Sequence, residues 1–173
     1  MPHDLIREIP VIAKRAAANE EEDFRFRAYL KGHSMSGARL DARVREITDD
    51  VWSQIDCTTC ANCCRAYTTS VDDVDIARLA KRLEITTAEF GKRYIDGVID
   101  GEKQLISKPC VFLGDDNRCT VYDDRPKVCR DFPYLHKDDF VFRLLMMIEN
   151  TSACPIVYNV WDRLKDDLWN RRR

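Results

Sequence analysis

The sequence CTTCANCC, residues 57–64, places four thiols within eight positions. Its cysteines, Cys57, Cys60, Cys63 and Cys64, follow a C-x2-C-x2-C-C pattern. A buried structural cysteine needs no neighbours of its own kind, whereas a soft metal ion or an iron–sulfur cluster needs several converging sulfurs. This stretch therefore predicts a metal site, with the rest of the chain folded around an irregular, cysteine-rich core.

Four further cysteines follow the run, so that eight thiols are candidate ligands in all. Adjacent side chains of an extended segment point apart, and Cys64 is therefore expected to serve a different centre or corner from Cys63. Spacing does not determine which cysteines share a centre, and several partitions stay open. One partition uses all eight thiols in two sets of four: Cys57, Cys60, Cys63 and Cys154 in one, with Cys64, Cys110, Cys119 and Cys129 in the other.

Length and composition support reduced thiols rather than a disulfide framework. Eight cysteines in 173 residues fall below the roughly 8–10% typical of small secreted disulfide scaffolds. The charged N-terminus lacks the apolar stretch of a signal peptide or membrane helix, which predicts a cytoplasmic protein without membrane attachment. A net charge of −2 provides no overall positive field for nucleic acid. The basic residues Arg171, Arg172 and Arg173 are interpreted as a solvated tail.

The first 50 residues are predicted to form a helical extension, and residues 51–173 the cysteine-cluster domain. Apolar residues recur at helical spacing before the cysteine run, at Leu40, Val44, Ile47, Val51 and Ile55. Glycine and serine in residues 32–37 favour a break between two helices. The second helix leads directly into Cys57 and is expected to fix one side of the cysteine loop, while the extension offers a surface for a protein partner.

Beyond the run, helix caps alternate with turn signals. Ser70 is expected to cap a helix over about residues 71–83 whose first turn is acidic. Thr86 or Thr87 is expected to cap a short helix that ends near Tyr94, with Glu89 available for a capping box. Residues 109–113 and 118–122 are predicted to pair as a hairpin that brings Cys110 and Cys119 together.

The C-terminal part of the chain is predicted to be helical again. Asp124-Arg125-Pro126 is typical of the start of a helical turn, which would contain Cys129. Residues 140–150 and 156–169 are predicted as two closing helices that meet at Cys154-Pro155. The expected fold class is therefore α+β and mostly helical, with a short hairpin and flanking helices around the cysteine core.

The motifs CTTCANCC, PCVFL, RCTVYDDRPKVCRDFP and CP, within residues 57–155, resemble the YkgJ-type CxxCxxCC cysteine-cluster family. That resemblance implies a zinc- or iron-chelating domain. The flagellin lysine N-methylase, an iron–sulfur protein, is a distant relative in that group. This chain has neither a G-x-G-x-x-G signature nor the C-x3-C-x2-C spacing of radical S-adenosylmethionine enzymes, so the methylase role is not transferred to it.

The spacing of the cysteines is the sequence evidence for which metal is bound. A compact C-x2-C-x2-C run is more typical of iron–sulfur clusters than of zinc fingers, which separate their cysteine pairs, although a four-cysteine zinc site stays open. Arg125 and Arg130 could donate to thiolates or pair with nearby aspartates, and His136 could supply a nitrogen ligand. Three hypotheses remain: an iron–sulfur or zinc protein for electron transfer or interaction, an iron–sulfur enzyme, and a structural zinc module.

Overall fold

The computed structural model describes residues 4–33 and 35–170 of the chain. Within them, α-helices α1–α8 and a three-stranded antiparallel sheet confirm the predicted fold class, α+β and mostly helical. The basic tail, residues 171–173, and Ser34 of the predicted break lie outside the described residues. No helix in these ranges is both long and apolar enough to cross a membrane.

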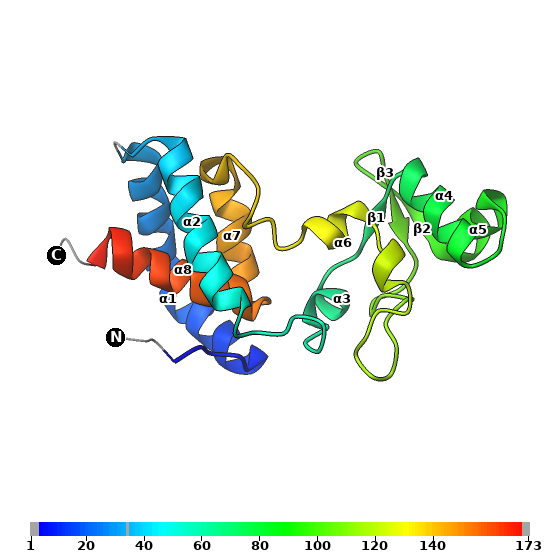
Figure 1. Cartoon of the computed structure of the whole chain (residues 1–173), viewed down its shortest axis with the longest axis horizontal. Coiled ribbons are helices and arrows are strands. Elements are labelled where there is room, and N and C mark those ends of the chain that lie inside the picture. The colour runs from blue at the N-terminus through cyan, green and yellow to red at the C-terminus, as the bar shows by residue number, and fades with distance from the viewer. Residues whose placement is uncertain (1–3, 34, 171–173) are drawn as a thin grey trace. The chain divides into compact units, whose positions relative to one another are not determined.

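The chain divides into two compact units (Figure 1). Met1–Cys57 and Pro133–Arg173 form the first, called here the helical unit, and Thr58–Phe132 form the second, called the cysteine unit. The predicted division at residue 50, into a helical extension and a cysteine-cluster domain, concerns which parts fold independently, and it stays a prediction.

The helical unit is built from long helices at both ends of the sequence. Its N-terminal half contains α1 (Ile9–Gly32) and α2 (Gly37–Trp52), with the predicted break between them. Its C-terminal half contains the 3-10 turn η2 (Phe140–Arg143), α7 (Leu144–Thr151) and α8 (Pro155–Leu168). Helix α8 packs against α1, α2 and α7, so it lies at the centre of the unit.

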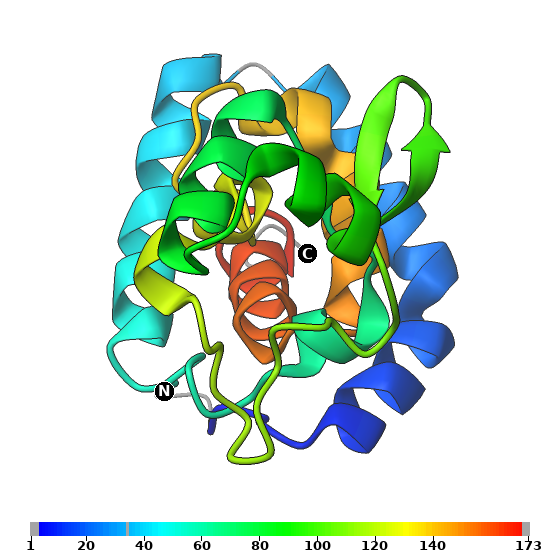
Figure 2. The same cartoon turned by 90° about the vertical axis from the view of Figure 1, so that its right-hand side faces the viewer.

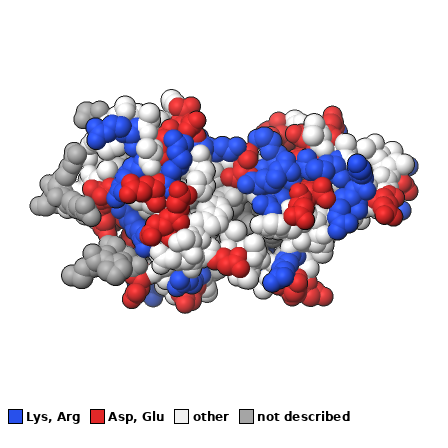
Figure 3. Space-filling model, in the orientation of Figure 1, with Lys and Arg blue, Asp and Glu red and all other residues white. Residues whose placement is uncertain are grey.

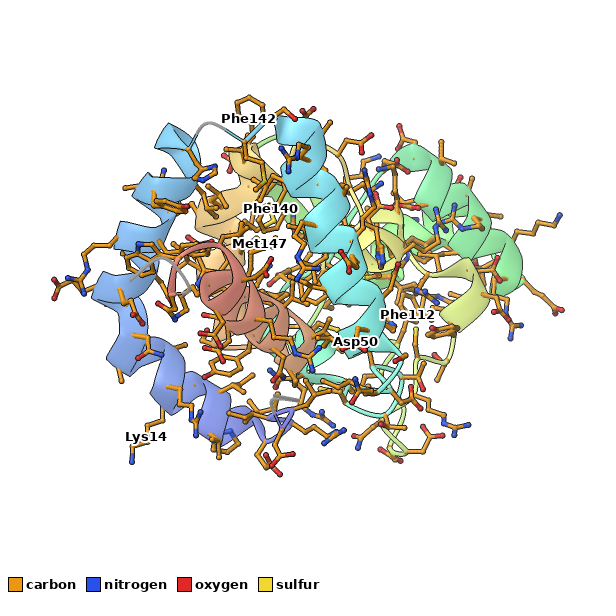
Figure 4. All side chains as sticks on the ribbon, turned by 60° about the vertical axis from the view of Figure 1, so that its left-hand side comes forward. Lys14, Asp50, Phe112, Phe140, Phe142 and Met147 are labelled. Atoms are coloured by element: carbon orange, nitrogen blue, oxygen red, sulfur yellow. The ribbon has the colours of Figure 1, made fainter. Side chains whose placement is uncertain are left out.

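The core of the helical unit combines apolar packing with one buried ion pair. Phe140 and Met147 lie inside the unit, whereas Lys14 points away from α1 (Figure 4). The Asp23 carboxylate on α1 accepts from Lys165 Nζ of α8 at 2.8 Å, and both residues are buried. Trp161 Nε1 donates to the same carboxylate oxygen at 2.9 Å. The two ends of the sequence are thus joined by specific polar contacts as well as by burial.

The cysteine unit begins with three α-helices, and a short strand separates the first from the other two. Its first elements are α3 (Asn62–Ala66), β1 (Ser70–Val71), α4 (Asp73–Arg82) and α5 (Thr87–Tyr94). Thr86 and Glu89 form the predicted capping box at α5. The predicted cap of α4 is wrong, because Ser70 lies in β1 and the Asp72 side chain accepts from the Asp75 amide instead.

A three-stranded sheet follows, which the sequence interpretation missed. Strands β2 (Ile95–Ile99) and β3 (Glu102–Leu105) form an antiparallel hairpin (Figure 2). Strand β1 pairs with the other side of β3. Asp100 and Gly101 at the turn both have positive φ. An Asp-Gly pair between two β-forming stretches is a strong hairpin signal, so this element could have been predicted.

The hairpin predicted over residues 109–122 is wrong as a pair of strands. Only Leu113 and Cys119 form a single antiparallel bridge there. The segment is instead a compact loop in which the Gly114 amide donates to Arg118 O at 2.8 Å. A Cβ atom at Gly114 would lie 3.2 Å from that carbonyl oxygen, so the close approach of the two chain segments favours glycine.

The rest of the cysteine unit contains η1 (Tyr122–Asp124) and α6 (Lys127–Asp131), which confirms the helical turn predicted around Cys129. Helices α4 and α5 cover a small apolar core that includes Leu79, Phe90 and Phe112. On the face of this unit shown in Figure 3, Lys and Arg side chains form a band flanked by acidic ones.

Candidate metal centre

The eight cysteines divide unequally between the two units. Cys57, which is exposed, and Cys154, which is buried, belong to the helical unit, and the other six belong to the cysteine unit. None of the eight, all within the described ranges, forms a disulfide. The thiols required for metal ligation are therefore present as thiols.

The end of the cysteine run is helical. Cys63 and Cys64 lie in the short helix α3, and their Sγ atoms are 3.9 Å apart. The expectation that the two side chains point apart is therefore wrong, because it assumed an extended backbone. Arg65 Nη1 donates to the carbonyl oxygen of Cys60 at 3.3 Å, which connects the start of the run to the helix.

Backbone contacts connect α3 with the loop that carries Cys110 and Cys119. The Cys110 amide donates to the Cys64 carbonyl oxygen at 2.8 Å. The Thr120 amide donates to Phe112 O at 2.9 Å, which closes the loop between the two cysteines. Residues separated by more than forty positions are thus fixed beside one another.

Four thiols of the cysteine unit interact electrostatically in every pairing: Cys64, Cys110, Cys119 and Cys129. Burial raises the pKa of the Cys110 and Cys119 thiols, and it raises the pKa of Cys129 to about 12. The hydrogen bond to Cys63, together with burial, raises the pKa of Cys64. These are the four thiols that the partition above groups together, and without a metal ion their raised pKa values keep them neutral at pH 7.

Thr69 is a polar partner within this set that sequence analysis did not identify. Its Oγ1 accepts from Cys129 Sγ at 4.0 Å, and a hydrogen bond between its side chain and Cys110 lowers the pKa of that thiol. Thr69 immediately precedes β1, and nothing in the local sequence distinguishes it from Thr68. Its role emerges only from the folded chain.

The arginines near Cys129 contact the backbone. Arg125 lies 3.8 Å from the centre of the Tyr122 ring and donates to Tyr122 O at 3.0 Å. Its charge lowers the pKa of Cys119, although burial dominates that thiol. Arg130 Nη1 donates to Arg125 O at 2.8 Å. His136 belongs to the helical unit, where its Nε2 lies 2.9 Å from Asp49 Oδ1.

The four thiols are grouped but are not in coordination geometry. Within residues 4–33 and 35–170, no three Cys, His, Asp or Glu side chains lie close enough together to hold a metal ion. The chemistry of the set nevertheless fits a soft metal, since four sulfurs are the donors used by structural zinc and by iron–sulfur clusters. A metal ion bound by all four sulfurs would require their side chains to rearrange.

Comparison with known proteins gives a family and one uncharacterized relative. The family model CxxCxxCC, described as "putative zinc- or iron-chelating domain", matches residues 56–155. An uncharacterized protein of Methanocaldococcus jannaschii, MJ0661, is 38% identical over 82 residues, which are 45% of this chain and 43% of that protein. The chain thus spans less than half the length of this relative. No solved structure matches the chain.

Proposed function

The chain belongs to the CxxCxxCC family of zinc- or iron-chelating domains, and we propose that Cys64, Cys110, Cys119 and Cys129 form one of its metal centres. The observation that carries this assignment is geometric: the Cys110 amide binds the Cys64 carbonyl oxygen at 2.8 Å, and the Thr69 side chain binds both Cys110 and Cys129. Metal binding itself follows from the family. What we propose in addition is the identity of the metal, the set of ligands and the biological role.

The surroundings of the four thiols suit a bound cation. Burial disfavours several thiolates close together, and a metal ion removes this penalty because it neutralises their charge. The positive charge of Arg125 likewise favours the thiolate of Cys119, because it lowers the pKa of that thiol. Partial burial limits the access of water, which favours retention of the metal.

We also propose the remaining four cysteines as metal ligands, without assigning all of them to one centre: Cys57, Cys60, Cys63 and Cys154. The C-x2-C-x2-C spacing of the first three favours an iron–sulfur cluster, and a cluster would supply one-electron redox chemistry when bound. We therefore propose a cytoplasmic iron–sulfur protein that transfers electrons to a partner docked on its helical part. Zinc in the same positions would instead give a structural interaction module.

The test is the content of iron, zinc and acid-labile sulfide per chain, measured on protein purified without oxygen. Iron with matching sulfide supports a cluster, and reversible bleaching of its visible absorption on reduction would support electron transfer. Zinc without sulfide would reject the redox role. Neither metal above background would reject the centre.

Two single variants separate the two proposed groups of ligands. Cys129→Ser is expected to remove the metal held with Cys64, Cys110 and Cys119, and Cys60→Ser the metal held by the C-x2-C-x2-C run. If the groups are correct, each variant keeps about half of the wild-type metal and the double variant keeps none. Unchanged metal content in Cys129→Ser would refute the assignment.

A further inference from the structure

A buried carboxylate of helix α4 caps the short helix that carries Cys129. The Lys127 amide, the first of α6, donates to Asp75 Oδ1 at 3.0 Å and to Oδ2 at 3.1 Å. Pro126 at the N-cap position of α6 provides no side-chain cap of its own. The Asp75 side chain is only 4% exposed. A buried carboxylate needs hydrogen-bond donors, and these amide contacts supply them.

An arginine of the same helix holds the segment just before α6. Arg78 Nε donates to Asp124 O at 3.1 Å, and its Nη2 donates to Arg125 O at 3.0 Å. The same guanidinium forms an ion pair with Asp75. Arg78 therefore fixes two consecutive carbonyl groups, those of Asp124 and Arg125. Asp75, one turn earlier on α4, fixes the amide of Lys127.

Helix α4 provides a rigid base for these contacts. Ile76, Leu79 and Ala80 of this helix are buried in the core of the cysteine unit. A displacement of α4 would therefore disturb the packing of the unit, whereas the loop over residues 124–127 contains only a 3-10 turn and a proline junction. The position of Cys129 depends on how firmly α4 holds this loop.

We propose that Asp75 and Arg78 are positioning residues of the metal centre, which hold residues 124–127 and so fix the Cys129 thiol for metal binding. The inference rests on the proposed function, because it takes Cys129 as a ligand. It assigns to an aspartate and an arginine on α4 a role that is distinct from capping their own helix, which Asp72 performs. Loss of a group that hydrogen-bonds a metal ligand commonly reduces metal affinity by about 10–100-fold, and for these contacts, which hold the backbone beside the ligand, we expect the lower end of that range.

The test uses the full chain, stripped of metal and reloaded with Zn²⁺, with the alkylation rate of each cysteine measured by peptide mass spectrometry. Asp75→Asn keeps the size of the side chain but removes its charge and one acceptor. Arg78→Lys keeps the charge but loses the planar fork that reaches two carbonyls. The matched control is Asp73→Asn, which removes a carboxylate from the same helical turn where the side chain is 88% exposed.

In the wild-type protein, Zn²⁺ is expected to protect Cys64, Cys110, Cys119 and Cys129. In Asp75→Asn and Arg78→Lys, Cys129 is expected to react about tenfold faster than in the wild type, while Cys110 and Cys119 stay protected. Zn²⁺ affinity, measured by competition with a chromophoric chelator, should fall about tenfold. Asp73→Asn should match the wild type in both measurements.

Different results identify which claim fails. If Zn²⁺ protects none of the four thiols in the wild type, the metal centre itself is wrong, and the positioning role fails with it. If the wild type is protected but both variants protect Cys129 equally well, only the positioning role is wrong. Equal exposure of all four thiols would also refute it, because it would indicate a general loss of stability. If Asp75→Asn does not fold, as judged by circular dichroism, Arg78→Lys decides.

Discussion

Replacement of Lys165 by methionine should strongly destabilise the helical unit. The ammonium group is almost completely buried, and it donates to Asp23 at 2.8 Å and to Glu22 at 3.4 Å. Methionine fills a similar volume, so the packing loss is small, but the Asp23 carboxylate stays buried with the Trp161 N–H as its remaining described donor. Breaking a buried pair in this way typically costs about 3–5 kcal/mol.

The assay can be restricted to the helical unit by tryptophan fluorescence. All three tryptophans of the chain, Trp52, Trp161 and Trp169, belong to this unit. With an m-value of about 1.5 kcal/mol/M, the expected loss lowers the urea midpoint by about 2–3 M. Far-UV circular dichroism should show that the variant is folded before urea is added.

Two further variants test the physical reason for this loss. Lys14→Met removes the same charged group from the exposed face of α1 and should change stability by less than about 0.5 kcal/mol. The double variant Asp23→Asn/Lys165→Met removes both charges, and it should be more stable than Lys165→Met alone by about 1–3 kcal/mol. A cost below about 1 kcal/mol for Lys165→Met, or a double variant no more stable than the single one, would refute the reasoning.

Three other predictions concern pH, a helix cap and a loop. In the metal-free chain the pKa of Cys129 is raised to about 12 from a usual value near 9. The contribution of this neutral thiol to stability is therefore complete below pH 9 and is lost as the pH rises toward 12. Urea unfolding followed by circular dichroism should show this decline, and a constant midpoint would contradict it. Thr86→Ala removes the capping box of α5 and should cost about 1 kcal/mol in thermal unfolding, whereas the exposed change Thr87→Ala should cost less. Gly114→Ala brings a methyl group 3.2 Å from Arg118 O and should speed alkylation of Cys119 in the metal-free protein, while an unchanged rate would show that the loop adjusts without cost.

Local signals in the sequence were sufficient for most of the helical elements. The apolar spacing from Leu40 to Val51 predicted α2, and Thr86 with Glu89 predicted the start of α5, because both signals act over three or four residues. The hairpin over β2 and β3 was missed although Asp100-Gly101 is a recognisable turn. The error arose because the strands were assigned to the cysteine-bearing segment, residues 109–122, instead of to residues 95–105.

The candidate site was predictable in composition but not in arrangement. Spacing marked the cysteines as ligands, yet it could not show that the backbone of Cys110 binds that of Cys64. It also could not reveal Thr69, because a threonine near a cysteine is too common to be informative. Asp75 falls in the predicted acidic first turn of a helix, but its contact with Lys127, 52 positions away, is a product of tertiary folding.

The order of the two units along the chain has a consequence for synthesis on the ribosome. The cysteine unit is contained within residues 58–132, whereas the helical unit needs α7 and α8, which are made afterwards. Domains commonly fold as their residues emerge. The six cysteines between Cys60 and Cys129 are therefore all available to an assembling metal centre while α1 and α2 still lack the helix that completes their core. Delivery of the metal can thus precede folding of the helical unit, and the nascent chain is the form to which a metal donor has its earliest access.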